Sequence, residues 1–278
     1  MYKIVKREEL NSTVTSIEVL APLVAKKAQP GQFIIFRVDE DGERVPLTIA
    51  DFDRVRGTVR IIFQIVGAAT AKLNMLREGD CIHDFVGPLG TPSHTEGLKK
   101  VAVVGGGVGC AIAYPVAKKI FEQGAEVDAI VGFRNKDLVI LQPEFAAHST
   151  RLFLMTDDGS CGTKGFVTEQ LEQLLNSGEC YDEVIAIGPL VMMRAVAKLT
   201  AKYNVKTTVS MNPIMIDGTG MCGGCRLTVG GKVKFACVDG PDFDGHQVDF
   251  EEAIARAAIY KPQETQALHE CNLTKGVR

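Results

Sequence analysis

The sequence contains no tryptophan, and aromatic residues make up only 6% of its 278 residues. It also has no excess of basic charge: 31 Lys and Arg stand against 34 Asp and Glu, for a formal net charge of −3. Nucleic-acid-binding proteins usually carry a basic patch or stripe, and the basic residues here are dispersed, so no nucleic acid is expected as a partner. Hydrophobic residues reach 46%, which is enough for a well-filled globular core.

Long apolar runs are missing as well. No stretch reaches the roughly 18 apolar residues that a membrane-spanning helix needs. The first ten residues, MYKIVKREEL, have neither the apolar segment nor the small-residue cleavage site of a secretory signal peptide. We therefore expect a cytoplasmic protein that does not bind membranes.

Cysteine, in contrast, is abundant, with eight residues. Three of them, Cys222, Cys225 and Cys237, lie within 16 residues of one another. In a reducing compartment such a cluster indicates metal binding rather than disulfide bonds. The other five are scattered and are expected to be small buried apolar residues: Cys81, Cys110, Cys161, Cys180 and Cys271.

The length suggests two domains and a small appendage, because a domain usually has roughly 100–200 residues. Residues 1–96 predict an antiparallel β-barrel, since short runs rich in β-branched and aromatic residues are separated there by Gly and Pro. The clearest strands cover residues 13–20, 32–38 and 58–66, and one short helix is expected at about 70–77.

Residues 97–211 predict a second domain of the α/β class. Apolar runs alternate there with amphipathic stretches, which is the pattern of a parallel sheet built from βαβ units. Strands are expected at 100–104, 127–131, 152–155, 183–187 and 207–211, and helices at 111–123, 143–148, 167–175 and 190–203. Residues 212–278 predict a small third module, with a helix over 250–260 and loosely ordered final residues.

The most specific motif is Asp217-x4-Cys222-x2-Cys225-x11-Cys237. A plant-type [2Fe-2S] site has the spacing C-x4-C-x2-C followed by a distant fourth cysteine, and Asp217 stands here in the first ligand position. Because a carboxylate can also ligate iron, the motif predicts a cluster held by one oxygen and three sulfur ligands. The alternative is a structural zinc site in which Asp217 is only a turn residue.

A glycine-rich turn follows the strand expected at 100–104. Its residues are Gly105, Gly106, Gly107, Val108 and Gly109. Glycines let a backbone approach a pyrophosphate closely, and the N-terminus of the next helix favours its negative charge. The turn therefore predicts a dinucleotide site, although any tight strand–helix turn can be rich in glycine.

A second turn, Thr156-Asp157-Asp158, follows the strand expected at 152–155. A carboxylate at this place accepts hydrogen bonds from a ribose 2′-hydroxyl and repels a 2′-phosphate, so Asp157 predicts a preference for NAD(H) over NADP(H). The alternative is that both aspartates are ordinary turn residues, and Arg134 and Lys164 lie near enough in sequence to weaken the repulsion.

The segment Arg44-Val-Pro46-Leu47-Thr48 lies within the predicted barrel. An arginine can pair with the pyrophosphate of a flavin, and a strand backbone can hold the edge of its ring. Gly67 and Thr70 begin a predicted helix whose N-terminus suits the same pyrophosphate. FMN has no pyrophosphate, so FAD is expected; taken separately, each feature is also an ordinary strand end or helix cap.

Taken in order, these motifs resemble a known superfamily. R-x-P-L-T, then G-x-x-T, then Gly87-Pro-Leu-Gly90, then G-G-G-V-G is similar to the ferredoxin–NADP reductases. The cysteine motif at the C-terminal end resembles that of the electron-transfer subunits of class 1B dihydroorotate dehydrogenases. The aspartate in the first ligand position resembles the small subunits of NADH-dependent reduced ferredoxin:NADP+ oxidoreductases, also known as sulfide dehydrogenase beta subunits, over nearly the whole chain.

This resemblance implies roles for the motifs. Arg44, Pro46, Leu47 and Thr48 would lie along FAD, and Gly67 and Thr70 would reach its phosphates. NAD(H) would be held by residues 105–109, and the cluster by Asp217 and the three cysteines. The sequence departs from plant-type reductases in lacking a terminal aromatic residue to cover the flavin.

The resemblance also implies a partner. The chain would form a heterodimer with a larger flavin and iron–sulfur subunit, which binds NADPH and reduces ferredoxin by electron bifurcation. This chain would serve the NAD(H) branch and interact with ferredoxin only indirectly. No catalytic acid–base residue is expected, because the cofactors carry the chemistry. Two alternatives are a dihydroorotate dehydrogenase subunit, against which Asp217 argues, and a non-catalytic, zinc-bearing adaptor that kept the reductase fold.

Overall fold

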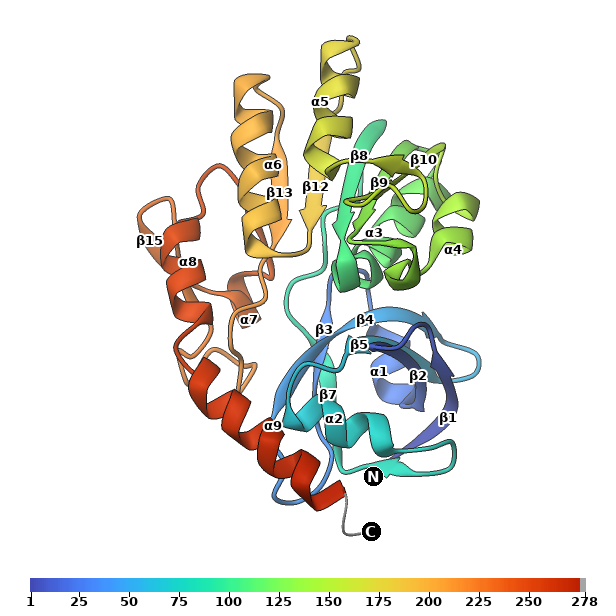
Figure 1. Ribbon diagram of the computed structural model, residues 1–278, viewed down its shortest axis with the longest axis vertical. Helices are drawn as coiled ribbons and strands as arrows, with labels where there is room; N and C mark the ends of the chain where they lie inside the picture. Colours follow the sequence, from blue (N-terminus) through green and yellow to red (C-terminus); the bar gives the residue numbers. More distant parts are fainter. Residues whose placement is uncertain (276–278) are drawn as a thin grey trace.

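The computed structural model describes the backbone of residues 1–275 and the side chains of residues 1–270. Two seven-stranded sheets dominate the structure, and the C-terminal segment runs along one side of both (Figure 1). No helix in the described part of the chain is long and apolar enough to cross a membrane.

The first sheet is antiparallel and curled, with the strand order β6-β1-β2-β5-β4-β3-β7. Its strands are β1 (Tyr2–Glu9), β2 (Val14–Leu20), β3 (Phe33–Arg37), β4 (Val45–Asp53), β5 (Thr58–Gln64), β6 (Cys81–Ile82) and β7 (Asp84–Leu89). Large buried side chains such as Phe36, Phe63 and Phe85 fill the inside of the curl. The predicted antiparallel architecture is confirmed, as a curled half-barrel.

Two helices accompany this sheet where only one was predicted. α2 (Ala68–Met75) starts slightly before the expected position. α1 (Pro22–Lys27) was missed, because six residues are too few to show a helical repeat of apolar positions. The proline at its first position was the available signal, since proline is favoured where a helix begins.

The second sheet has the order β11-β10-β9-β8-β12-β13-β16 and is parallel except at β16. Its strands from the middle of the chain are β8 (Lys100–Gly106), β9 (Glu126–Phe133), β10 (Arg151–Thr156), β11 (Thr163–Lys164), β12 (Glu183–Ile187) and β13 (Thr207–Ser210). The helices that connect them are α3 (Cys110–Glu122), α4 (Gln142–Ala147), α5 (Val167–Asn176) and α6 (Leu190–Lys202). The predicted α/β architecture is confirmed. The strand order reverses between β8 and β12.

Helices cover both faces of the second sheet. Alternate residues of β8 divide between two cores, with Val101 and Val103 packed on the side of α3 and α4, and Ala102 and Val104 on the side of α5 and α6. Such apolar strands, buried on both faces, are typical of parallel sheets. Ile62 from the curled sheet joins the α3 core, so the two sheets are packed together through α3.

The C-terminal segment contains β14 (Arg226–Val229), β15 (Lys232–Phe235), α7 (Ala236–Asp239), β16 (Asp242–Asp244), α8 (Phe250–Ala257) and α9 (Lys261–Lys275). β16 pairs with β13 and so adds a last strand to the second sheet, although it comes from beyond residue 211. The prediction that the final residues are loosely ordered is wrong for α9, which packs beside α2 (Figure 1). Residues 276–278 lie outside the described residues.

Candidate functional site

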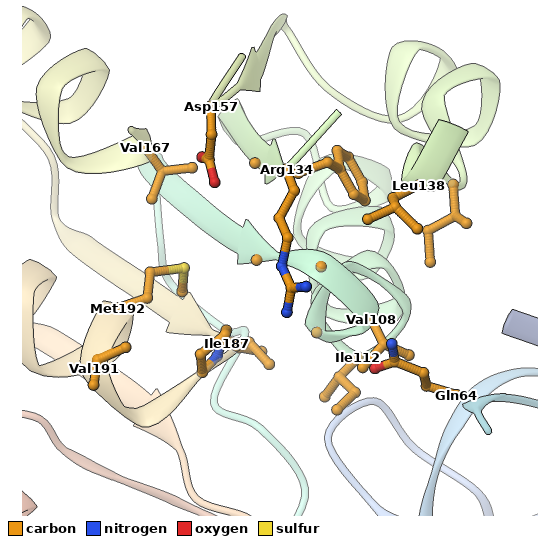
Figure 2. Close-up of a pocket in the computed structure, with 18 of the residues that line it drawn as sticks. Gln64, Val108, Ile112, Arg134, Leu138, Asp157, Val167, Ile187, Val191 and Met192 are labelled. Atoms are coloured by element: carbon orange, nitrogen blue, oxygen red, sulfur yellow. The ribbon is translucent and has the colours of Figure 1, made fainter. Parts of the chain in front are cut away.

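A cavity of about 800 Å³ lies at the carboxyl ends of the parallel strands. The turn Gly106–Gly109 after β8 lines it, as do Ile187, Gly188 and Pro189 at the end of β12. Asn11, in the turn between β1 and β2, and Gln64, at the end of β5, also line it, and Gln64 reaches toward Val108 and Ile112 (Figure 2). Dinucleotides bind parallel sheets of this kind at the point where the strand order reverses. The cavity therefore lies where a nicotinamide nucleotide could meet a group held by the curled sheet.

The glycines of this turn have different structural reasons. A Cβ atom on Gly105 would lie 2.8 Å from the sulfur of Cys110, and one on Gly109 would lie 2.6 Å from the Cα atom of Gly188. A Cβ atom on Gly106 would collide with the side chain of Met192. These three glycines allow the helices to pack closely on the strands. Gly107 differs, because a Cβ atom there would meet nothing within 4 Å, and its φ of +56° favours glycine. Gly107 is thus the glycine of the turn that leaves space for a ligand.

Asp157 and Arg134 line the same cavity. Arg134 projects from the end of β9 into the open space, with Asp157 above it at the end of β10 (Figure 2). Asp158 does not line the cavity. Its carboxylate instead accepts hydrogen bonds from the backbone N–H and the hydroxyl of Ser160 at 2.9 and 2.6 Å, and these bonds lower its pKa. The structure thus separates the two aspartates: Asp157 faces the cavity and Asp158 closes its own turn.

Two exposed apolar side chains on the wall of the cavity were missed in the sequence. Phe166, just before α5, is 60% exposed, and Val191 in α6 is 57% exposed. A large apolar side chain on a cavity wall is a suitable contact for a flat, partly apolar ligand. Phe166 comes directly before the helix predicted at 167–175, but nothing in the sequence places it near Arg134 or Asp157. Lys164, which was expected near the same site, does not line the cavity.

The predicted flavin segment lies at the start of β4. Pro46, Leu47 and Thr48 pair with β3, and all residues from 44 to 48 are half-buried. A strand with one face in the core normally alternates between buried and exposed residues. Five consecutive half-buried residues indicate that the outer face of this stretch is only partly covered by protein, which leaves room for a flat group along it.

Gly67 and Thr70 form the N-terminal cap of α2. The hydroxyl of Thr70 accepts hydrogen bonds from the N–H groups of Val66 and Gly67, both at 3.1 Å, and donates one to the carbonyl of Gly67 at 3.0 Å. Thr70 therefore shapes the helix start with its side chain rather than reaching outward. A Cβ atom on Gly67 would meet nothing within 4 Å, and its φ of −148° suits any residue. Neither packing nor backbone conformation requires glycine here, and the space beside its Cα atom is open.

The three clustered cysteines belong to one loop and the helical turn that faces it. The sulfur atoms of Cys225 and Cys237 are 3.3 Å apart in the core, and Cys222 lies exposed nearby. Gly218, Gly220 and Gly223 have positive φ values, which let the loop curve tightly. Among the described residues, no three His, Cys, Asp or Glu side chains are already arranged to hold a metal ion. The Asp217 carboxylate accepts hydrogen bonds from the backbone N–H groups of Thr219 and Met221 at 2.9 and 3.3 Å.

The environment of the thiols suits an iron–sulfur cluster. Backbone N–H groups point at the sulfur of Cys222 and lower the pKa of its thiol. The hydrogen bond from the N–H of Gly224 has the largest effect. Burial has the opposite effect on Cys237 and raises the pKa of its thiol to about 11, with a further contribution from the neighbouring Cys225, so this thiol loses its proton only when it binds a metal. N–H groups directed at sulfur stabilise ligated thiolates in such clusters. The donor set of three thiols and one carboxylate on a glycine-rich loop therefore fits the predicted group.

This loop packs directly on the curled sheet. A Cβ atom on Gly218 would lie 2.7 Å from Ile35 and 2.8 Å from Leu89, so only glycine fits there. Arg44 donates a hydrogen bond from Nε to the carbonyl of Ile216 at 2.7 Å. Its charge also helps to lower the pKa of Asp217, after the stronger effect of the hydrogen bonds from Thr219. The predicted flavin and cluster residues are therefore neighbours, although more than 170 positions separate Arg44 from Ile216 in sequence.

Comparisons with known proteins agree with this arrangement. Residues 212–249 match the family model of the iron–sulfur cluster binding domain of dihydroorotate dehydrogenase B. An uncharacterized protein of Clostridium beijerinckii, from the adh 3′ region, is 52% identical, with 96% of this chain and 93% of that protein covered. A homologue of the dihydroorotate dehydrogenase B (NAD(+)) electron transfer subunit from Thermotoga maritima is 45% identical, with 94% and 92% covered.

One solved structure covers 97% of both chains, with a TM-score of 0.93 and 42% identity. It is a chain from a structure of an NADH-dependent reduced ferredoxin-NADP oxidoreductase, solved for insight into flavin-based electron bifurcation.

A curled antiparallel sheet, a parallel sheet with a dinucleotide-type turn and a cysteine loop between them define an oxidoreductase of the ferredoxin reductase type. This confirms the expected class of enzyme. The chain belongs to the family of dihydroorotate dehydrogenase B electron transfer subunits and their homologues. At the level of this family, FAD, NAD(H) and a [2Fe-2S] cluster are confirmed as the cofactors.

Proposed function

We propose that this chain is the NAD(H)-linked electron-transfer subunit of a bifurcating NADH-dependent reduced ferredoxin:NADP+ oxidoreductase. The observation that carries the proposal is the contact between the start of β4, where the flavin is expected, and the loop that carries Asp217, Cys222 and Cys225. There Arg44 donates a hydrogen bond to the carbonyl of Ile216, and Gly218 packs on Ile35. The nucleotide cavity is lined by Gln64, the last residue of β5, which is the strand next to β4 in the curled sheet. Nucleotide, flavin and cluster sites would thus follow one another through the chain. The high similarity to a bifurcating oxidoreductase chain over 97% of both lengths supports the finer assignment.

The cofactors supply the electron chemistry: a flavin accepts a hydride and gives up electrons singly, and a [2Fe-2S] cluster carries one electron at a time. The protein binds and orients them. Gly107 would admit the nucleotide pyrophosphate, and the start of β4 would hold the flavin ring. The N–H groups at the start of α2 would face the flavin pyrophosphate, because the N-terminus of a helix favours negative charge.

In the nucleotide cavity, we infer complementary roles for Asp157 and Arg134. The carboxylate of Asp157 would accept hydrogen bonds from the hydroxyls of the adenine ribose, which selects NAD(H). The guanidinium of Arg134 projects into the same space and has no ion pair within the described residues (Figure 2). It is suited to the nucleotide's pyrophosphate. Phe166 would offer its ring face to the adenine.

The partner would be a larger flavin and iron–sulfur subunit in a heterodimer, with ferredoxin reached only through that subunit. Around the cluster loop, Met221 is 87% exposed and Ile216 is 53% exposed. Exposed apolar side chains next to a redox group are typical of a protein interface. We infer that this face contacts the partner. It consists of Ile216, Met221 and the exposed Cys222. The predicted cytoplasmic location stays a prediction.

The main alternative is a subunit of a class 1B dihydroorotate dehydrogenase, as the names of several relatives suggest. Asp217 argues against it, because that position is a cysteine in the plant-type spacing. The match of residues 212–249 to an iron–sulfur domain argues against the zinc-bearing adaptor.

Anaerobic co-purification with the partner subunit tests the proposal. We expect about two irons and two acid-labile sulfides per C-terminal motif. The flavin released from this chain by heat should be FAD rather than FMN. The complex should reduce ferredoxin with NADPH only when NAD+ is present. A partner that oxidises dihydroorotate would instead support the alternative. Zinc without iron would refute the cluster, and FMN as the released flavin of this chain would refute FAD.

A further inference from the structure

A second cavity, of about 330 Å³, lies between the curled sheet and the C-terminal helix. Its volume is at the lower end of the range for small-molecule sites. Three segments line it: the end of β3 and the loop after it, the first turns of α2, and α9. The lining residues are Val38, Asp41, Gly42, Glu43, Ala68, Ala69, Lys72, Ala267 and Glu270. None of them lines the nucleotide cavity.

The walls are built from short side chains. Gly42, Ala68, Ala69 and Ala267 leave the space open where α9 crosses α2. Protein interiors and element contacts are normally packed without voids of this size. Within residues 261–270 only Ala267 and Leu268 are half-buried, and the others are exposed. α9 therefore contacts α2, and an open space remains beside this contact.

The position of the cavity connects it with the proposed flavin site. Ala68 and Ala69 directly follow Gly67, beside whose Cα atom the space is open. Glu43 directly precedes Arg44. A dinucleotide whose pyrophosphate lies at Gly67 would have one of its two ends next to this cavity.

The charges of the cavity indicate which end. Among the described lining residues, Asp41, Glu43 and Glu270 are acidic, and the one lysine, Lys72, is 3.2 Å from Asp39 in an ion pair. Carboxylates would repel phosphate, but they accept hydrogen bonds from hydroxyl and amino groups. A ribose presents hydroxyls and adenine presents an amino group, so an uncharged adenosine suits these side chains.

We propose that this cavity binds the adenosine half of FAD and that α9 is its outer wall. The proposal rests on FAD as the flavin of the proposed function. It assigns a binding role to the C-terminal helix, which none of the sequence motifs includes. It also predicts that the helix discriminates FAD from FMN, because FMN has no adenosine to place there.

The test compares two tryptophan variants of the full-length chain, purified with its cluster. Ala267→Trp fills the cavity, while His269→Trp puts the same side chain on an exposed position of the same helix. Each protein is freed of flavin and titrated separately with FAD and FMN by flavin fluorescence, and its melting temperature is measured. We expect Ala267→Trp to weaken FAD binding by about tenfold or more, equivalent to about 1.4 kcal/mol, with FMN binding unchanged, and His269→Trp to alter neither.

The outcomes separate this inference from the proposed function. Unchanged FAD binding in Ala267→Trp would overturn the inference alone, and so would an equal loss of FAD and FMN. If the unmodified chain itself failed to prefer FAD over FMN, the flavin assignment of the proposed function would fall together with it. A chain shortened after Tyr260 provides a second readout: if it melts cooperatively and still binds FMN, it should have lost its preference for FAD.

Discussion

At the scale of single residues, Asp157 is the side chain whose charge should decide the nucleotide. Replacing it with serine removes the repulsion of a 2′-phosphate and a hydrogen-bond acceptor for the 2′-hydroxyl. We expect Asp157→Ser to reduce the ratio of kcat/KM for NADH over NADPH by about tenfold, or about 1.4 kcal/mol. Diaphorase assays of the purified chain with each nucleotide measure this ratio.

Asp158→Ser is the matched control, because its carboxylate is bound to Ser160 and lies outside the cavity. It should leave the ratio unchanged. A preference for NADPH in the unmodified chain would contradict the NAD(H) assignment. An unchanged ratio in Asp157→Ser would show that Asp157 does not select the nucleotide, even if the chain preferred NADH.

Gly67 provides a second prediction at this scale. A methyl group there meets no protein atom within 4 Å and needs no unusual φ. Gly67→Ala should therefore change the stability of the flavin-free chain by no more than about 0.5 kcal/mol. It should nevertheless weaken FAD binding by about tenfold, because the methyl group occupies the space at the pyrophosphate. Thermal melting and flavin titration test both parts, and full FAD affinity in the variant would place the phosphate elsewhere.

The residue types of the site could be predicted from the sequence, but the reasons for them could not. The turn from Gly105 to Gly109 indicated a nucleotide, yet Gly106 and Gly109 are required by Met192 and Gly188, which are distant in sequence. The pairing of Arg44 with the Ile216 carbonyl was likewise not predictable. Contacts of this kind depend on how separate elements pack, and no local pattern records that.

At the scale of elements, the loop with Cys222 and Cys225 should bind the cluster independently of whether the start of β4 holds the flavin. Cys225 is buried and adjoins Cys237, and no residue of the flavin segment depends on its thiol. Cys225→Ser should therefore lose the visible absorption of the cluster and about two irons per chain, while FAD remains bound. Metal analysis and the absorption spectrum measure the two effects separately.

Cys161→Ser controls for the loss of any one thiol, because Cys161 is partly buried near β10 and lies outside the loop. It should retain cluster and flavin alike. A fully coloured cluster in Cys225→Ser would remove Cys225 from the ligand set, and loss of FAD together with the cluster would contradict the independence of the two sites.

Long, strongly periodic elements were predictable, and short or exposed ones were not. β8, β9 and β12 are apolar runs buried on both faces, so their sequence alone identifies them. β11 has only two residues, both exposed, and was not predicted. α1 is too short to show a period. α9 has few apolar residues to form a buried stripe, so the sequence resembled a loosely ordered tail.

At the scale of the whole molecule, the exposed apolar residues around the cluster loop should hold the partner subunit. Met221→Asp places a charge in the proposed interface, where a buried charge without a partner is costly. We expect the variant to reduce co-purification of the larger subunit and to weaken the complex by about tenfold or more. The isolated chain should keep its cluster, its flavin and its NADH diaphorase activity.

Val55→Asp is the corresponding control. Val55 is 98% exposed in the turn between β4 and β5, which packs on α1 and not on the cluster loop. An equal loss of the partner in both variants would show that surface charge, rather than this face, weakens the complex. An unaffected complex in Met221→Asp would place the interface elsewhere.

The attachment of β16 to β13 restricts how such a chain can diverge. The segment that carries the cysteine loop also supplies the last strand of the nucleotide-binding sheet, and Phe243 of that strand lies in the same core as Cys225 and Cys237. A recombination event that exchanged this segment would leave β13 as a bare edge and uncover part of the core. The segment that carries the cysteines therefore cannot be exchanged as an independent unit. We expect its properties to change through single replacements within the intact fold, of which an aspartate in the first ligand position would be one example.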